Sequence, residues 1–127
     1  MGTIWGDFMR FIYNENLTKD MVKRYYKKYE DIDGELEIIC GSRKVAMVGR
    51  CFMEHEVPAI SFRLKGSMEF EGETQPVEIA LSEDEIENAL TTMVEASGRK
   101  VKRVSINFDE KSFKSVVVEA VAKRKIK

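Results

Sequence analysis

The chain is poor in the residues that cross-link small secreted domains or break a chain into loops. It contains 2 cysteines, 2 prolines, 8 glycines and 1 histidine in 127 residues. So few cysteines exclude a disulfide framework. The scarcity of Pro and Gly, together with 43% hydrophobic residues, excludes a disordered chain. A chain of this length is therefore expected to fold as one globular domain.

The sequence also lacks an apolar run of about 18 residues, so we predict no membrane span. Its first residues, MGTIWGDFMRFIY, are apolar and aromatic, but they lack a basic start and a small-residue cleavage site. Asp7 and Arg10 interrupt them. They do not resemble a signal peptide, and we expect a cytoplasmic protein with reduced thiols.

Apolar spacing predicts two helices at the beginning of the chain. Residues 4–13 place Ile4, Trp5, Phe8, Met9 and Ile12 at helical spacing. Thr18 is the predicted N-cap of a second helix that ends near Asp31. Residues 1–31 are thus expected to form a helical N-terminal segment.

Residues 32–81 change to a period of two and are predicted to form a β-meander. The first strand ends at Cys40, and residues 41–43 form a hairpin loop. The second strand, 44–54, is apolar on both faces, as in a strand that is covered twice or used at an interface. Pro58 opens the third strand, and residues 77–81 belong to the fourth.

A capping box of Ser82 and Glu85 predicts a helix over residues 82–98. Residues 99–127 are expected to form a β-hairpin with a basic end, although a helix over 110–124 is the alternative for its second half. The order ααββββαββ predicts an α+β domain with a mainly antiparallel sheet and helices packed mostly on one face.

Positive charge is concentrated at the end of the chain. Residues 99–127 contain 10 Lys or Arg and 3 Asp or Glu, whereas residues 1–98 contain 11 and 19. If the hairpin pairs Phe108 with Phe113, Val104 with Val117 and Arg99 with Ala122, eight cationic side chains meet at its open end. This basic cluster consists of Arg99, Lys100, Lys102, Arg103, Lys123, Arg124, Lys125 and Lys127.

Like charges across a hairpin repel each other, so the basic cluster needs solvent, acidic neighbours or a partner. One interpretation is a solvated terminus that protects a strand edge. A second is compensation by acidic residues 83–87 or 69–73 of the same or another copy. A third is phosphate binding to a nucleic acid, helped by lysines and tyrosines within residues 19–29. No zinc-finger, RNP or GxxG motif supports the third interpretation.

No catalytic motif is found, and the carboxylates follow no acid–base pattern. His55 and Cys51 share a strand face, but four strand residues span about 13 Å, too far for a hydrogen bond. We interpret His55 as a surface-loop histidine, with a nucleophile or metal site as the alternative. Residues 41–44, GSRK, only faintly resemble a phosphate loop. We therefore expect no enzyme, no cofactor and no metal site.

The resulting hypothesis is a small non-enzymatic interaction or accessory protein that self-associates or binds a protein partner. Its support is the two-faced strand 44–54, the charge polarity, and an aromatic first segment. That segment contains Trp5, Phe8, Phe11 and Tyr13. The alternative hypothesis is a nucleic-acid-binding accessory protein that uses the basic cluster.

Overall fold

The computed structural model describes the backbone of residues 3–47 and 53–125, and the side chains of residues 8–45 and 55–122. The elements are β1 (Thr3–Tyr13), α1 (Glu15–Tyr29), β2 (Asp33–Met47), β3 (Met53–Phe70), β4 (Glu73–Leu81), α2 (Glu83–Glu95), β5 (Arg99–Phe108) and β6 (Phe113–Lys125). All strand pairs among them are antiparallel, and the prediction of a single α+β domain is confirmed.

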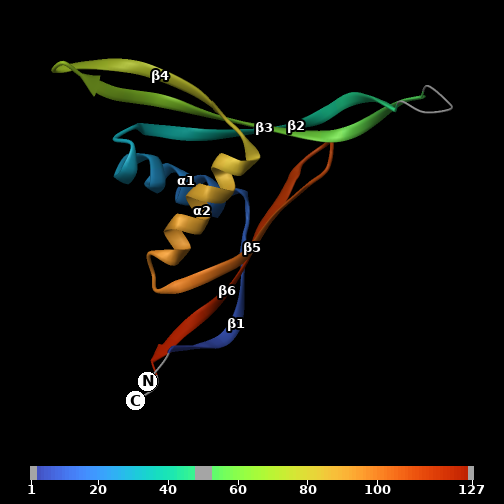
Figure 1. The fold of residues 1–127 in the computed structure, drawn as a ribbon. Coiled ribbons are helices and arrows are strands. Elements are labelled where there is room, and N and C mark those ends of the chain that lie inside the picture. Colours follow the sequence, from blue (N-terminus) through green and yellow to red (C-terminus); the bar gives the residue numbers. More distant parts are fainter. Residues whose placement is uncertain (1–2, 48–52, 126–127) are drawn as a thin grey trace.

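The strands form two three-stranded sheets instead of one. In the first sheet, β6 lies between β1 and β5, and in the second, β3 lies between β2 and β4. The two sheets form the sides of a V, and both helices lie between them (Figure 1). Each sheet therefore packs one face against the helices, and its other face points outward.

The helix predicted over residues 4–13 is wrong, because this segment is strand β1. The apolar residues at helical spacing belong to the two faces of a strand. Phe11 and Tyr13 pack against the core, whereas Phe8 and Ile12 are exposed. Aromatic and β-branched residues suit a pleated surface, and β1 finds its partner in β6 at the far end of the chain. The tertiary pairing therefore overrides the local periodicity.

The N-cap of α1 is Asn14, and the prediction of Thr18 in this role is wrong. The Asn14 side chain accepts a hydrogen bond from the backbone N–H of Leu17, with 2.8 Å between Oδ1 and N. Thr18 lies one turn further inside the helix and is fully buried. Its hydroxyl has no hydrogen-bond partner among the described residues.

We expect Thr18→Val to stabilise the protein by about 1 kcal/mol. Valine keeps the shape of threonine, and it removes a hydroxyl that loses its water on folding without gaining a partner. Urea unfolding followed by circular dichroism measures the change. Thr18→Ala is the control, because it also removes a methyl group and should be less stable than the valine variant. A valine variant that is less stable than the natural protein would contradict this account.

Strands β2 and β3 form one long hairpin without the predicted interruption. Residues 41–43 lie within β2, so the loop expected there is wrong. Pro58 pairs with Ser42 inside β3 and does not open that strand. The predicted strand 44–54 is divided between β2 and β3, and its residues 48–52 lie outside the described residues.

The distal half of this hairpin is a two-stranded arm that extends past the core (Figure 1). Strand β4 pairs with β3 only from Phe62 to Phe70. Between Met53 and Phe62, β3 therefore has no described strand on the side away from β2. A proline is tolerated at such an edge because no ladder hydrogen bond is needed there.

The capping box that predicts α2 is confirmed. The backbone N–H of Glu85 donates to Ser82 Oγ over 3.1 Å, and the backbone N–H of Ser82 donates to Glu85 Oε1 over 3.3 Å. The helix ends at Glu95, slightly before the predicted end.

Residues 113–125 form strand β6, which decides against the helix considered for this segment. Both ends of the predicted register with β5 are confirmed, namely Phe108 with Phe113 and Arg99 with Ala122. In the middle, Val104 pairs with Val118 and not with Val117. Irregularities near the two ends of β5 shift the register by one residue and then restore it.

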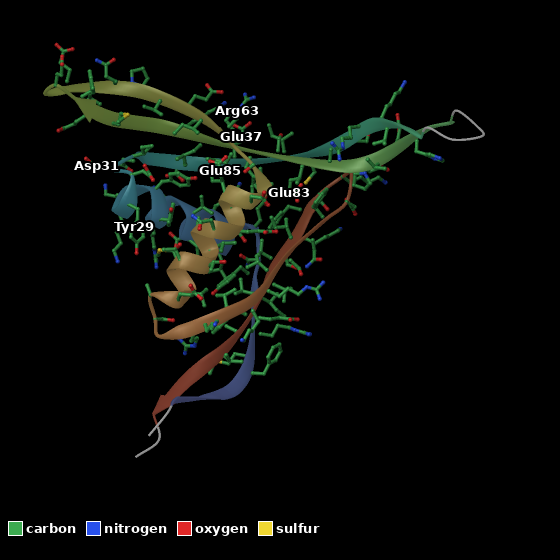
Figure 2. All side chains as sticks on the ribbon, viewed as in Figure 1. Tyr29, Asp31, Glu37, Arg63, Glu83 and Glu85 are labelled. Carbon is green, nitrogen blue, oxygen red and sulfur yellow. The ribbon has the colours of Figure 1, made fainter. Side chains whose placement is uncertain are left out.

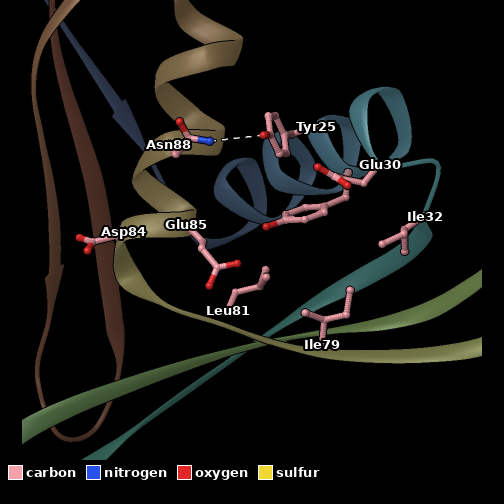
Figure 3. A pocket seen from close by; sticks show the side chains of 9 residues that line it. Tyr25, Glu30, Ile32, Ile79, Leu81, Asp84, Glu85 and Asn88 are labelled. Atoms are coloured by element: carbon pink, nitrogen blue, oxygen red, sulfur yellow. Dashed lines mark hydrogen bonds between the residues drawn. The ribbon is translucent and has the colours of Figure 1, made fainter.

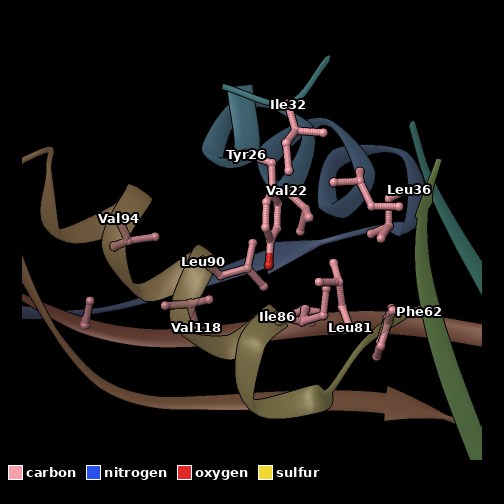
Figure 4. Close-up of a cluster of buried hydrophobic side chains, with 13 residues drawn as sticks. Val22, Tyr26, Ile32, Leu36, Phe62, Leu81, Ile86, Leu90, Val94 and Val118 are labelled. Carbon is pink, nitrogen blue, oxygen red and sulfur yellow. The ribbon is translucent and has the colours of Figure 1, made fainter. Parts of the chain in front are cut away.

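One apolar core joins the two sheets and the two helices (Figure 4). Its members come from both helices and from the inner faces of both sheets. They include Val22, Tyr26, Leu36, Phe62, Leu64, Leu81, Ile86, Leu90, Val116 and Val118. Because this core occupies the inside of the V, the outer faces of the sheets are left for other contacts.

Candidate interaction surface

The sheet β1–β6–β5 has one face that no described element covers. On the central strand, Val116, Val118 and Ala120 are fully buried in the core, so the residues between them point to the opposite side. The register places three rows of residues on that side, which we call the open face: Phe8–Val121–Lys100, Arg10–Glu119–Arg103 and Ile12–Val117–Ser105. Side chains on this side of the strands project away from the helices (Figure 2).

Apolar side chains occupy two of these three rows. Phe8 is 58% exposed and Ile12 is 64% exposed, and both are among the large apolar residues that the core does not use. Val121 and Val117 lie beside them on the central strand. The sequence signal for this arrangement is the alternation of Phe8, Arg10 and Ile12, which the helical interpretation of this segment concealed.

The middle row of the open face is charged. Glu119 accepts a hydrogen bond from Arg10, with 3.3 Å between Nη2 and Oε1, and Arg103 is its partner in the register on the other side. Lys100 lies opposite Val121. The described part of the open face thus has three cationic side chains and one carboxylate, and its charged middle row separates the two apolar rows.

The basic cluster does not form one surface in the described part of the chain. Arg99 turns to the inner side of its sheet, where its guanidinium donates to Ser97 Oγ over 2.8 Å and to Met9 Sδ over 3.3 Å. It also lies over the ring of Phe11, with 5.4 Å to the ring centroid. To reach β1, the Arg99 side chain passes over the central strand β6. The small side chain of Ala120 on that strand leaves room for it. Arg99 therefore ties β5 to β1.

The other members of the basic cluster are dispersed, and Lys100 lies on the open face. Lys102 and Arg103 line a shallow groove of about 350 Å³ together with Asp84 and Glu87 of α2. Compensation by the acidic start of that helix stays a prediction. Residues 123–125 continue β6 and pair with β1 instead of β5. Their side chains, and Lys127 as a whole, lie outside the described residues.

Three of the four lysines of α1 face acidic neighbours. Lys19 lies 3.8 Å from Glu15, and Lys27 lies 3.4 Å from Asp33 of β2. Lys23 forms an ion pair with Glu35 of the same strand. Such exposed pairs contribute little stability, but they leave this helix with less cationic surface for phosphate than its sequence indicates.

His55 is an exposed residue within β3, opposite Val45 in the arm, and does not lie in a loop. Cys51 lies outside the described residues, so the structure does not test their pairing. Cys40 is a free thiol whose pKa is raised by burial, and Asp109 and Glu15 add to this effect. No group of three or more His, Cys, Asp or Glu side chains within the described ranges is arranged to hold a metal ion.

The outer face of the sheet β2–β3–β4 carries two cross-strand ion pairs, whereas one such pair is found on the open face among the described residues. Arg63 lies 3.1 Å from Glu78, and Lys65 lies 3.2 Å from Glu37. Arg63 and Glu37 mark this face in Figure 2. The polar alternation predicted for the third strand is responsible for this solvated surface.

A groove of about 500 Å³ opens between the end of α1, strand β4 and the start of α2 (Figure 3). It is lined by Tyr25, Tyr26, Glu30, Ile32, Ile79, Leu81, Asp84, Glu85 and Asn88. Asn88 donates a hydrogen bond to the Tyr25 hydroxyl over 3.3 Å and so links the two helices. Burial raises the pKa of Tyr26 to about 12, and the charge of Glu85 adds to the effect. Sequence reasoning missed this groove, because only the packing of α1 against α2 brings its walls together.

Comparisons of the chain with protein-family models, with curated proteins and with solved structures find no significant match. Neither of the helices in the described ranges has the length and apolar character needed to span a membrane. The functional argument therefore depends on the surfaces described above.

Proposed function

We propose that this protein is a non-enzymatic interaction protein that binds a protein partner through the open face. The observation that carries the proposal is the exposure of Phe8 and Ile12 on a sheet face that no described element covers. Large exposed apolar side chains that lie together with charged residues on an uncovered sheet face are typical of interaction sites. The cytoplasmic location remains a prediction.

The charges of the open face favour a partner that is not a second copy. In the middle row, Arg10 and Arg103 lie on the two sides of Glu119, so this row has one more cation than carboxylate. Two open faces in direct contact would bring like charges together, which is unfavourable. An apolar patch bordered by acidic residues would be complementary to this surface.

Photo-cross-linking in cells of the native host tests the proposal. A photoreactive amino acid at position 12 should cross-link to one specific protein, which mass spectrometry of the product identifies. The matched control is position 39, because Ile39 is also an exposed isoleucine but lies on the outer face of the other sheet. Absence of a specific product at position 12, or the same products at both positions, would contradict the proposal. A cross-linked product of two copies of this chain would instead show that the protein associates with itself through the open face.

With the identified partner, we expect Ile12→Glu to weaken binding by at least about tenfold, because it places a carboxylate in an apolar contact. Ile39→Glu should leave the affinity within about twofold of the natural protein. Titration calorimetry of the purified proteins measures both. Equal affinities for the two variants would exclude the open face as the binding site.

Nucleic-acid binding is the second candidate function, and the observation in its favour is that exposed Phe8 lies on the same face of β1 as Arg10. Aromatic side chains that stack on bases and cations that contact phosphates are combined in single-strand binding proteins. Binding of labelled single-stranded DNA and RNA at two salt concentrations tests it. Affinity that falls steeply with salt and is lost in Phe8→Ala would support this function. Affinity that Phe8→Ala leaves unchanged would count against it.

A further inference from the structure

We propose that the groove between α1, β4 and α2 binds a small aliphatic diamine, with one ammonium group at Glu30 and the other at Glu85. This site is separate from the open face, and it does not depend on the function proposed above. The groove volume of about 500 Å³ lies in the usual range for small-molecule sites.

The negative charge of the lining is the first observation, and it depends on Glu30 and Glu85, because Asp84 also lines the second groove with Lys102 and Arg103. The lining includes Glu30, Asp84 and Glu85 but no lysine, arginine or histidine. Acidic residues in other parts of the described chain pair with lysine or arginine, as Glu35, Asp33 and Glu37 do. Among the described residues, neither Glu30 nor Asp84 forms an ion pair. A ligand for this groove is therefore a cation.

The second observation is the hydroxyl of Tyr26. This side chain is only 8% exposed, and it lines the groove. No described residue forms a hydrogen bond with its hydroxyl, and the ring extends from α1 into the cluster of buried side chains (Figure 4). Because Tyr26 lines the groove, an ammonium group bound there can donate to this oxygen, which accepts no hydrogen bond from a described residue.

The positions of the two glutamates indicate a cation with two charges. Glu30 is the C-cap of α1, whereas Glu85 lies in the first turn of α2, and Figure 3 shows them on opposite walls of the groove. They are not arranged as a metal site, because the described residues contain no suitable cluster of ligands. Oε1 of Glu85 accepts hydrogen bonds from the backbone N–H and the hydroxyl of Ser82, whereas Oε2 accepts none from the described residues.

The surface between the glutamates suits methylene groups. Ile32, Ile79 and Leu81 form an apolar floor between them (Figure 3). The rings of Tyr25 and Tyr26 lie edge to face with 5.1 Å between their centroids, and they add π-electron surface that attracts a cation. At the Glu30 end, the C-terminus of α1 also favours positive charge. An extended chain with an ammonium group at each end matches this pattern.

Titration calorimetry of the full-length protein with 1,5-diaminopentane tests the inference. We expect the diamine to bind at least about tenfold more tightly than 1-aminopentane, because the second ammonium group adds a charge-assisted hydrogen bond. The neutral 1,5-pentanediol should not bind. If the monoamine binds as tightly as the diamine, or if the diamine does not bind, the inference is wrong.

Three variants locate the site. Glu30→Gln and Glu85→Gln should each weaken diamine binding about tenfold, and glutamine at position 85 retains the capping box. Tyr26→Phe should weaken it about fivefold while keeping the ring in the core. The matched control is Glu83→Gln, which removes a carboxylate from the same helix turn but not from the groove lining. An equal loss in Glu83→Gln would mean unspecific attraction and would overturn the assignment.

Discussion

Replacing Phe62 with alanine is expected to lower the free energy of unfolding by about 3–5 kcal/mol. Phe62 lies in the central strand of the sheet β2–β3–β4 and is 2% exposed. It is also among the largest fully buried side chains. Because the core joins both sheets to both helices, a cavity at this position weakens the contact of one whole sheet with the rest of the molecule. Urea unfolding followed by circular dichroism measures the loss.

Phe70→Ala is the matched control for this prediction. It makes the same substitution in the same strand, and the alternation of the strand gives residues 62 and 70 the same face. Phe70, however, is 60% exposed, because it lies beyond the helices that cover Phe62. We expect Phe70→Ala to lower the free energy of unfolding by less than about 1 kcal/mol. If the two variants lost similar amounts of unfolding free energy, Phe62 would not be buried in the core as the structure shows.

Gly66→Ala should destabilise the protein by at least about 2 kcal/mol, for a reason unrelated to cavities. Gly66 pairs directly with Gly34 across the β2–β3 hairpin. A Cβ atom at position 66 would lie 2.1 Å from the carbonyl oxygen of Asp33 and 2.4 Å from the Cα atom of Gly34. Both are backbone atoms, so the two strands would have to separate at this point.

Gly41→Ala provides the control in the same hairpin. A Cβ atom at position 41 meets no atom within 4 Å. Alanine also loses less conformational entropy than glycine on forming a strand, so we expect a change within about 0.5 kcal/mol. Thermal unfolding of the two variants under identical conditions separates the effects. Equal melting temperatures would disprove the close approach of the strands at Gly66.

The two proposed sites can be tested independently because they lie on different elements. Ile12→Glu changes the outward face of β1 and should leave diamine binding unchanged. Glu30→Gln changes the end of α1 and should leave partner binding unchanged. If both variants abolished both activities, a general loss of folded protein would be the simpler explanation, and their unfolding curves would show it.

The elements that were predicted correctly are those whose signals are local. The capping box of Ser82 and Glu85 satisfies the free N–H groups of the first turn of α2 with nearby side chains, so the sequence alone marks where this helix begins. The strict alternation around Phe62 and Leu64 likewise indicates a strand with one buried face. The ends of the β5–β6 register follow from the short turn that joins these strands.

The elements that were missed are those that depend on distant partners. Residues 3–13 have apolar side chains on both faces, and such a pattern is compatible with a helix or a strand. Pairing with β6 decides for the strand. Residues 41–43 have turn-forming residue types, but the partner strand continues past them, so the ladder of hydrogen bonds extends through Ser42. Asn14 and Thr18 are both good N-caps, and the burial of Thr18 decides between them.

By itself, the sequence determined the α+β class, the helix α2, the β character of residues 33–81 but not the number of strands in it, the final hairpin and the polarity of charge, because each depends on neighbours in the chain. Only the tertiary structure decided that the strands divide into two sheets and that Phe8 and Ile12 face outward. It also decided that Arg99 turns inward to Phe11, and that Glu30 and Glu85 line one groove. The physical reason is that burial and charge compensation depend on the elements that pack together, and in this protein β1 packs with β6 and α1 with α2.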